Sequence, residues 1–143
     1  MPTHHTEFKT QLVAALAADS GVTGLLASAS AVYYRWPAQS VAYPAVIYEY
    51  DTDYAPEPNR EGIRRLTLTL YCVGPDPDVL DQLEAALQAL LDESPSTLTT
   101  ANWHCRKLRL VRSETHDAGH HDPETHQSLF VNATSWRVSL YAS

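Results

Sequence analysis

The fold is decided by one stretch, residues 63–91, which reads IRRLTLTLYCVGPDPDVLDQLEAALQALL. Its first part alternates apolar and polar residues, and this period of two predicts a β-strand over residues 63–73 with one buried face. The apolar positions are Leu66, Leu68, Leu70 and Cys72, and the positions between them are Arg65, Thr67, Thr69 and Tyr71. Threonine and tyrosine favour a pleated, half-exposed surface, so the second face of this strand is expected to be polar.

The second part of the stretch predicts an amphipathic helix over residues 77–91. Asp76 is a good N-cap, and Pro77 suits the first helical position, where the missing N–H is not needed. The apolar residues that follow recur at helical spacing: Val79, Leu80, Leu83, Ala86, Leu87, Leu90 and Leu91. Ser94 and Pro95 end the pattern.

An N-terminal helix is indicated by apolar residues at spacings of four, three and one, namely Phe8, Leu12, Ala15 and Leu16. We expect Thr6 to be its N-cap, Glu7 to lie in its first turn, and Gly21 to end it. A further short turn is expected over residues 22–28.

Four more strands are expected, over residues 32–36, 45–53, 103–112 and 129–141. In the second of them, Val46, Tyr48 and Tyr50 share one face while Ile47, Glu49 and Asp51 share the other, so we expect it to be covered on one side only. In the last, the shared apolar side consists of Phe130, Thr134, Trp136, Val138 and Leu140. Residues 54–62 read as a hairpin loop, and residues 114–126 as a polar, irregular one.

The order of these elements defines the fold class, because helices do not alternate one-for-one with strands. We therefore predict a single α+β domain over residues 1–143, with a largely antiparallel sheet of about five strands packed against two main helices. No internal repeat is present.

Composition excludes several classes of protein. With 44% hydrophobic and 19% charged residues and a net charge of −7, the chain has a globular composition and is not a general binder of nucleic acid or anionic membranes. No apolar run reaches the roughly 18 residues of a membrane span, and the first residues lack the features of a secretion signal. The two cysteines, Cys72 and Cys105, suit a reducing compartment. A cytoplasmic protein is expected.

Motifs for nucleotide binding and hydrolysis are missing. None of the five glycines falls into a dinucleotide or phosphate-loop pattern, and the chain has neither a nucleophile elbow nor a zincin motif. We therefore expect no enzyme activity, no catalytic or cofactor-binding residues, and no cofactor.

The segment 114–126 is rich in titratable residues, which are Glu114, His116, Asp117, His120, His121, Asp122, Glu124 and His126. Histidine and carboxylate can bind zinc, manganese or iron, so a metal-dependent enzyme that uses this loop is one alternative. A solvated loop between two strands explains the same composition, and no second shell for a metal is visible in the sequence. We predict no metal site here.

Charged residues gather in two further places. A basic stretch contains Arg106, Lys107, Arg109 and Arg112, and strand alternation is expected to place Arg106 and Arg112 beside Leu108 and Leu110, with Lys107 and Arg109 on the opposite face. The opposite charge is carried by Glu49, Asp51, Asp53, Glu57 and Glu61. The two sets could pair within the fold or between copies, and the sequence leaves both possibilities open.

Tyrosine is unusually common, with eight tyrosines against two phenylalanines. The tyrosines are Tyr33, Tyr34, Tyr43, Tyr48, Tyr50, Tyr54, Tyr71 and Tyr141. Such residues suit sheet faces that dock against another protein, although each also fits an ordinary strand with a hydrated hydroxyl group. A small protein-binding module is therefore another alternative.

The order and spacing of the elements resemble the small tail-completion, or tail-terminator, proteins of long-tailed bacteriophages. Four features carry this resemblance: the helix around Phe8, Leu12 and Leu16; the prolines of Trp36-Pro37 and Tyr43-Pro44 before a strand; the strand from Arg65 to Tyr71 leading into the helix that ends at Leu91; and the terminal strand pair with a polar loop.

The resemblance implies a structural assembly protein rather than an enzyme. Proteins of this family form a hexameric ring at the head-proximal end of the tail tube, where they stop tube growth and meet the head connector. Partners would be other copies of the chain, the tail tube protein and connector or neck proteins, with no membrane and no direct nucleic-acid recognition. The chain would belong to the virion tail and be assembled in the host bacterial cytoplasm, with residues 51–62 and 114–126 as contacts.

Overall fold

The computed structural model describes residues 4–37, 41–53, 62–121 and 127–142. Its helices are α1 (His4–Ala18), α2 (Ser20–Thr23), α3 (Pro77–Leu91) and the short 3-10 helix η1 (Pro95–Leu98). Its strands are β1 (Val32–Tyr34), β2 (Ala45–Asp53), β3 (Ile63–Gly74), β4 (Trp103–His121) and β5 (Ser128–Ala142). They form one sheet in the order β1-β2-β3-β5-β4, parallel only between β1 and β2. The predicted α+β fold is confirmed.

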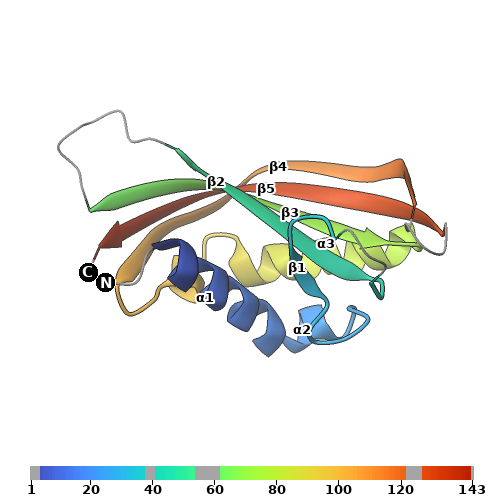
Figure 1. Ribbon diagram of the computed structural model, residues 1–143, viewed down its shortest axis with the longest axis horizontal. Helices are drawn as coiled ribbons and strands as arrows, with labels where there is room; N and C mark the ends of the chain where they lie inside the picture. Colours follow the sequence, from blue (N-terminus) through green and yellow to red (C-terminus); the bar gives the residue numbers. More distant parts are fainter. Residues whose placement is uncertain (1–3, 38–40, 54–61, 122–126, 143) are drawn as a thin grey trace.

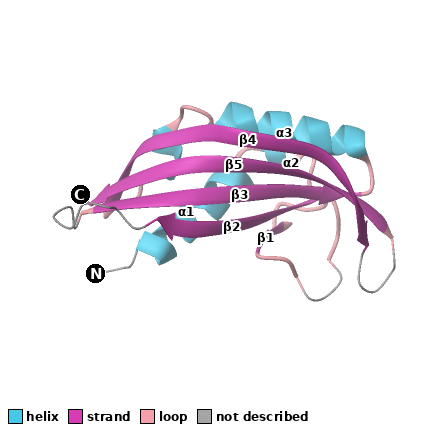
Figure 2. Cartoon of the chain, turned by 90° about the horizontal axis from the view of Figure 1, so that it is seen from above, coloured by secondary structure: helices cyan, strands magenta, loops and turns pink. Residues whose placement is uncertain are grey.

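The described helices lie on one side of the sheet, as Figure 1 shows, and the view from above in Figure 2 shows the strands side by side with the helices behind them. We call the side that the helices cover the covered face, and the other side the open face. On the covered face, Leu66, Leu68, Leu70 and Cys72 are fully buried beneath the helices, as the alternation in residues 63–73 predicts.

Trp136 is the largest fully buried side chain on the covered face. It lies opposite Leu68 in the pairing of β3 with β5, and its Nε1 donates a hydrogen bond of 2.9 Å to Oγ1 of Thr134. The ring is therefore held among leucines while its one polar atom is satisfied, which is the condition for burying an indole without penalty.

Helix α3 confirms the cap and the apolar stripe expected from the sequence. The Asp76 carboxylate accepts a hydrogen bond of 3.0 Å from the backbone N–H of Asp78, and Pro77 occupies the first position. The side chains buried against the sheet are Leu80, Leu83, Leu87 and Leu91.

The expected ends of the first helix are wrong. Helix α1 already includes His4, so Thr6 lies inside its first turn and is not the N-cap. Glu7 does lie in this turn, where its carboxylate accepts hydrogen bonds of 3.2 Å from the backbone N–H and Nδ2 of Asn102. The helix stops before Asp19, whose extended backbone turns the chain, and Gly21 falls within α2.

The terminal hairpin also differs from the prediction. Strand β4 does not end at Arg112 but continues to His121, so most of the expected loop over residues 114–126 is strand. Pairing with β5 overrides the polar composition, and register shifts between Leu110 and Arg112 and beyond Glu114 absorb the irregular sequence. The side chains of residues 116–120, and residues 122–126 entirely, lie outside the described residues.

Candidate interaction surface

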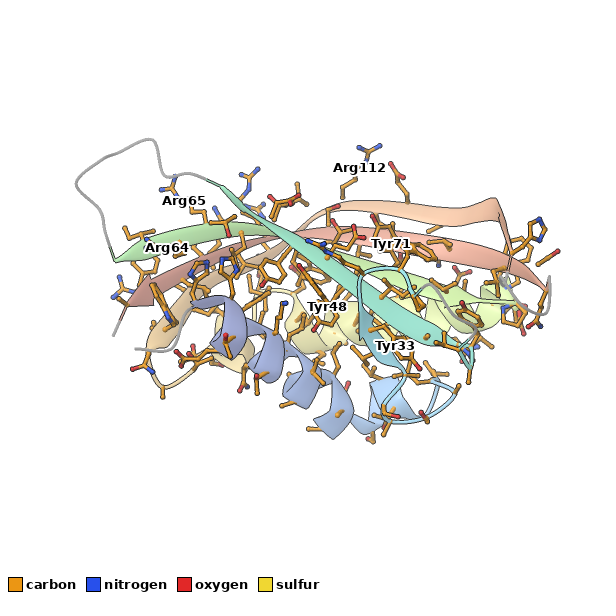
Figure 3. All side chains as sticks on the ribbon, viewed as in Figure 1. Tyr33, Tyr48, Arg64, Arg65, Tyr71 and Arg112 are labelled. Carbon is orange, nitrogen blue, oxygen red and sulfur yellow. The ribbon has the colours of Figure 1, made fainter. Side chains whose placement is uncertain are left out.

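One end of the open face is apolar. Ile47, Val73, Leu129 and Val131 form a second buried cluster there, and Tyr33, Tyr43 and Tyr71 pack against it. The Trp36 ring lies 5.4 Å from the Tyr71 ring. The expectation that β2 is covered on one side only is therefore wrong at Ile47, because residues distant in the sequence bury it. Tyr71 lies on the side away from the helices, as predicted (Figure 3).

The remainder of the open face is polar and arranged in rows that run across the strands. Residues directly opposite each other on neighbouring strands have side chains on the same face of a sheet. The rows, read from β2 to β4, are Asp51–Thr67–Arg137–Arg109 and Glu49–Thr69–Ser135–Arg112. Each row begins with a carboxylate on β2 and ends with a guanidinium on β4.

Bulges in β4 gather the basic stretch on this face. Simple alternation placed Arg112 beside Leu108 and Leu110, but the register shift after Leu110 pairs Arg112 with Ser135 instead. Lys107, Arg109 and Arg112 therefore share the open face, where Figure 3 shows Arg112 pointing away from the helices. Arg106 falls in the register shift between Cys105 and Lys107, with its guanidinium 4.6 Å from the centre of the Tyr141 ring. The predicted split of the basic stretch is wrong for Arg112.

Three of the cations surround a surface hollow of about 210 Å³ that is lined by Lys107, Arg109, Leu110, Val111 and Arg137. Arg109 lies directly opposite Arg137, and like charges in this position destabilise a sheet. Val111, at 55% exposure, is one of the two most exposed large hydrophobic side chains among the described residues. We call Lys107, Arg109 and Arg137 the cationic hollow.

Long polar strands at a sheet edge have an ordinary structural role as well. Strand β4 is one of the two edge strands of the sheet, and lysine, arginine and bulges on edge strands prevent indiscriminate pairing with other chains. This edge-strand role accounts for the basic stretch without nucleic-acid binding.

Other tyrosines are used for packing on the covered face. Tyr34, Tyr48 and Tyr50 lie close together, and Lys9 places its Nζ 3.8 Å from the centre of the Tyr34 ring. The Tyr50 hydroxyl is within hydrogen-bond distance, 3.0 Å, of His5 Nδ1. Burial and the neighbouring tyrosines raise the pKa of Tyr50 to about 12, so it stays protonated.

A buried histidine lies at the start of α1. Burial, together with the neighbouring His5 and Arg64, lowers the pKa of His4 to about 4. Its Nε2 and the Nε1 of Trp103 are buried without a hydrogen-bond partner, and the two rings are 5.5 Å apart. We expect His4 to make the stability of the fold depend on pH.

The described residues contain no recognisable reactive centre. Burial raises the pKa of Cys72, and it raises the pKa of Cys105 to about 11, so both thiols are unreactive. Among these residues, no group of three or more histidine, cysteine, aspartate or glutamate side chains could hold a metal. The alternative of a metal-dependent enzyme depended mainly on side chains that lie outside the described residues, including those of His116, His120 and His126. No helix in the described part is long and apolar enough to cross a membrane.

Comparison with known proteins identifies the fold. No family model matches the sequence, and no curated protein matches it. Among solved structures, the chain superimposes on a chain of the virion of a native gene transfer agent (GTA) particle with a TM-score of 0.63. The two chains share one fold. The match covers 94% of this chain and 97% of the GTA chain at 17% sequence identity, so it extends through the sheet and the helices alike.

Proposed function

We propose that this chain is a structural protein of a phage or phage-like particle, and that it forms a ring at the head-proximal end of the tail tube. The observation that carries this proposal is the fold shared with a GTA virion chain over nearly the full length of both chains. The order of sequence elements independently resembles tail-terminator proteins. In this role the chain belongs to the virion, is assembled in the bacterial host, and is not an enzyme.

The shape of the domain supports an assembly role. A structural ring protein needs surfaces that contact neighbours, and this chain has a sheet with helices described on one face only. Its two sheet edges differ, since β1 is three residues long and β4 is nineteen. Unlike edges suit heterologous contacts, in which different patches of successive copies meet and the chain of contacts closes into a ring.

The role can be tested by removing the gene from the phage or prophage that encodes the chain and imaging the particles by negative-stain electron microscopy. We expect heads separated from tails and tubes of excessive, variable length, because nothing ends tube growth. Adding back the wild-type chain should restore joined tails of uniform length. Tubes of normal length that fail to join heads would replace the terminator role with a neck role, and normal joined particles would contradict both.

A further inference from the structure

The polar part of the open face carries opposite charges at its two sides. Glu49 and Asp51 lie on β2, whereas Lys107 and Arg109 lie on β4 and Arg137 on the adjoining β5. Threonine and serine occupy most of the positions between them. At these residues the face is therefore acidic on β2 and basic on β4 and β5, whereas Arg112, farther along β4, already forms an ion pair with Glu114.

These charges do not neutralise each other within one chain. Strands β3 and β5 separate β2 from β4, so Lys107 and Arg109 lie three strand spacings, about 14 Å, from Glu49 and Asp51, while Arg137 on β5 lies two spacings, about 10 Å, from them. Among the described residues, Glu49, Asp51, Lys107, Arg109 and Arg137 make no ion pair. Of the two pairings that the sequence left open, the one within the fold is not made by Glu49 or Asp51, and the side chains of Asp53, Glu57 and Glu61 lie outside the described residues.

The neighbouring positions of these cations also destabilise an isolated chain. Arg109 and Arg137 lie opposite each other, Lys107 is the next residue of β4 on this face, and all three line a hollow of about 210 Å³. Carboxylates placed in this hollow would relieve the repulsion and form charge-assisted hydrogen bonds with both guanidinium groups. The geometry is thus that of a receptor for acidic side chains.

We propose that the cationic hollow of one copy receives Glu49 and Asp51 of the next copy. The inference rests on the proposed ring and identifies the contact between its neighbouring subunits. Both partners are accessible, because β4 is an edge strand and, in the described part of the chain, β1 pairs with β2 only as far as Tyr48. Each copy carries both halves of the contact, so the same interface repeats from copy to copy around a closed ring.

Charge reversal tests the contact directly. The first variant combines Glu49→Lys with Asp51→Lys, and the second combines Lys107→Glu with Arg109→Glu. Native mass spectrometry and sedimentation of the full chain should show a wild-type oligomer, and each variant alone should dissociate at least about tenfold more readily, because like charges then meet. Raising the salt from about 0.1 M to about 1 M should weaken the wild-type oligomer, since exposed ion pairs are screened.

Mixing the two variants is the decisive test of the proposed contact. The first variant is basic on both sides and the second is acidic on both sides, so only contacts between unlike variants are attractive. An equimolar mixture should recover oligomers that contain the two variants in alternation, at a ratio of one to one. Circular dichroism of each variant checks that the fold is retained, and Asp78→Lys, which reverses an exposed charge on α3, should leave the oligomer unchanged.

Three results would overturn the proposed contact. They are a wild-type chain that stays monomeric up to its solubility limit, reversal variants that assemble like the wild type, and a mixture that recovers nothing although both variants are folded. None of them decides the proposed function, which the gene-removal experiment tests separately: a ring built through other surfaces would still end tube growth.

Discussion

The two faces of the sheet differ in composition and burial, although both are made from the same strands. On β3, Leu66, Leu68 and Leu70 are buried without exception, while Thr67 and Arg65 on the other side remain exposed. The covered face contributes folding free energy through apolar burial. Outside the buried cluster around Ile47 and Val73, the open face is polar, contributes little to folding and even places Arg109 opposite Arg137. A surface that opposes stability in the monomer is a good candidate for one that functions in an assembly.

The largest effect should come from the covered face. Trp136→Ala removes a fully buried ring and leaves a cavity, so the free energy of unfolding should fall by about 3–5 kcal/mol. Val111→Ala on the open face should change it by less than about 0.5 kcal/mol, because Val111 is mostly exposed. Chemical denaturation measures both. Equal losses for the two variants would remove the distinction between the faces.

Acid should lower the free energy of unfolding through the protonation of His4. Its pKa is about 4 in the folded chain against 6.5 in the unfolded chain, so the unfolded chain binds the proton first as pH falls. Its contribution to stability is full above about pH 6.5 and is lost progressively toward pH 4. His4→Gln should therefore reduce the drop in melting temperature between about pH 7 and pH 5, and the exposed His104→Gln should not. Identical pH profiles for all three proteins would contradict this role.

Substitutions of Asp76, the N-cap of α3, should have a smaller effect on stability. This effect should depend on the hydrogen-bond acceptor and not on the negative charge. Asp76→Ala removes the acceptor for the Asp78 N–H and should cost about 1 kcal/mol in thermal or chemical unfolding. Asp76→Asn keeps an acceptor oxygen at this position and should stay within a few tenths of a kcal/mol of the wild type. If asparagine were as harmful as alanine, the hydrogen bond would not be the reason.

The smallest predicted effect has the opposite sign. Arg137→Thr relieves the repulsion from Arg109 and should stabilise the monomeric chain by about 0.2–1 kcal/mol while weakening the oligomer. Arg65→Thr is the control, because Arg65 lies opposite Ser139 on β5 and Asp53 on β2 and opposite no cation, so its removal relieves no repulsion. Denaturation at concentrations too low for assembly measures the first effect, and sedimentation measures the second. A loss of stability on removing Arg137 would show that the open face supports the fold.

The elements that the sequence predicts correctly are those whose signal is local. The alternation in residues 63–73, the Asp76 cap and the stripe from Leu80 to Leu91 each depend on neighbouring residues only, and all three are confirmed. The position of Tyr71 on the polar face follows from the same alternation.

The elements that it misses depend on distant partners. The extension of β4 to His121 and the turning of Arg112 onto the open face both follow from the register with β5, which the local composition does not encode. Burial of Ile47 requires Leu129 and Val131, which are more than eighty positions away. The charged rows likewise depend on the strand order and could not be predicted from the sequence, because they combine residues from four strands.

Thiol labelling tests most directly whether the open face is the surface through which the chain assembles. The two native thiols are buried, so a single introduced cysteine can be followed alone. Val111→Cys, beside the cationic hollow, should react quickly in the monomer and be protected in the oligomer, while Ala85→Cys on the exposed side of α3 should react equally in both. Equal reactivity of Val111→Cys in monomer and oligomer would contradict the account.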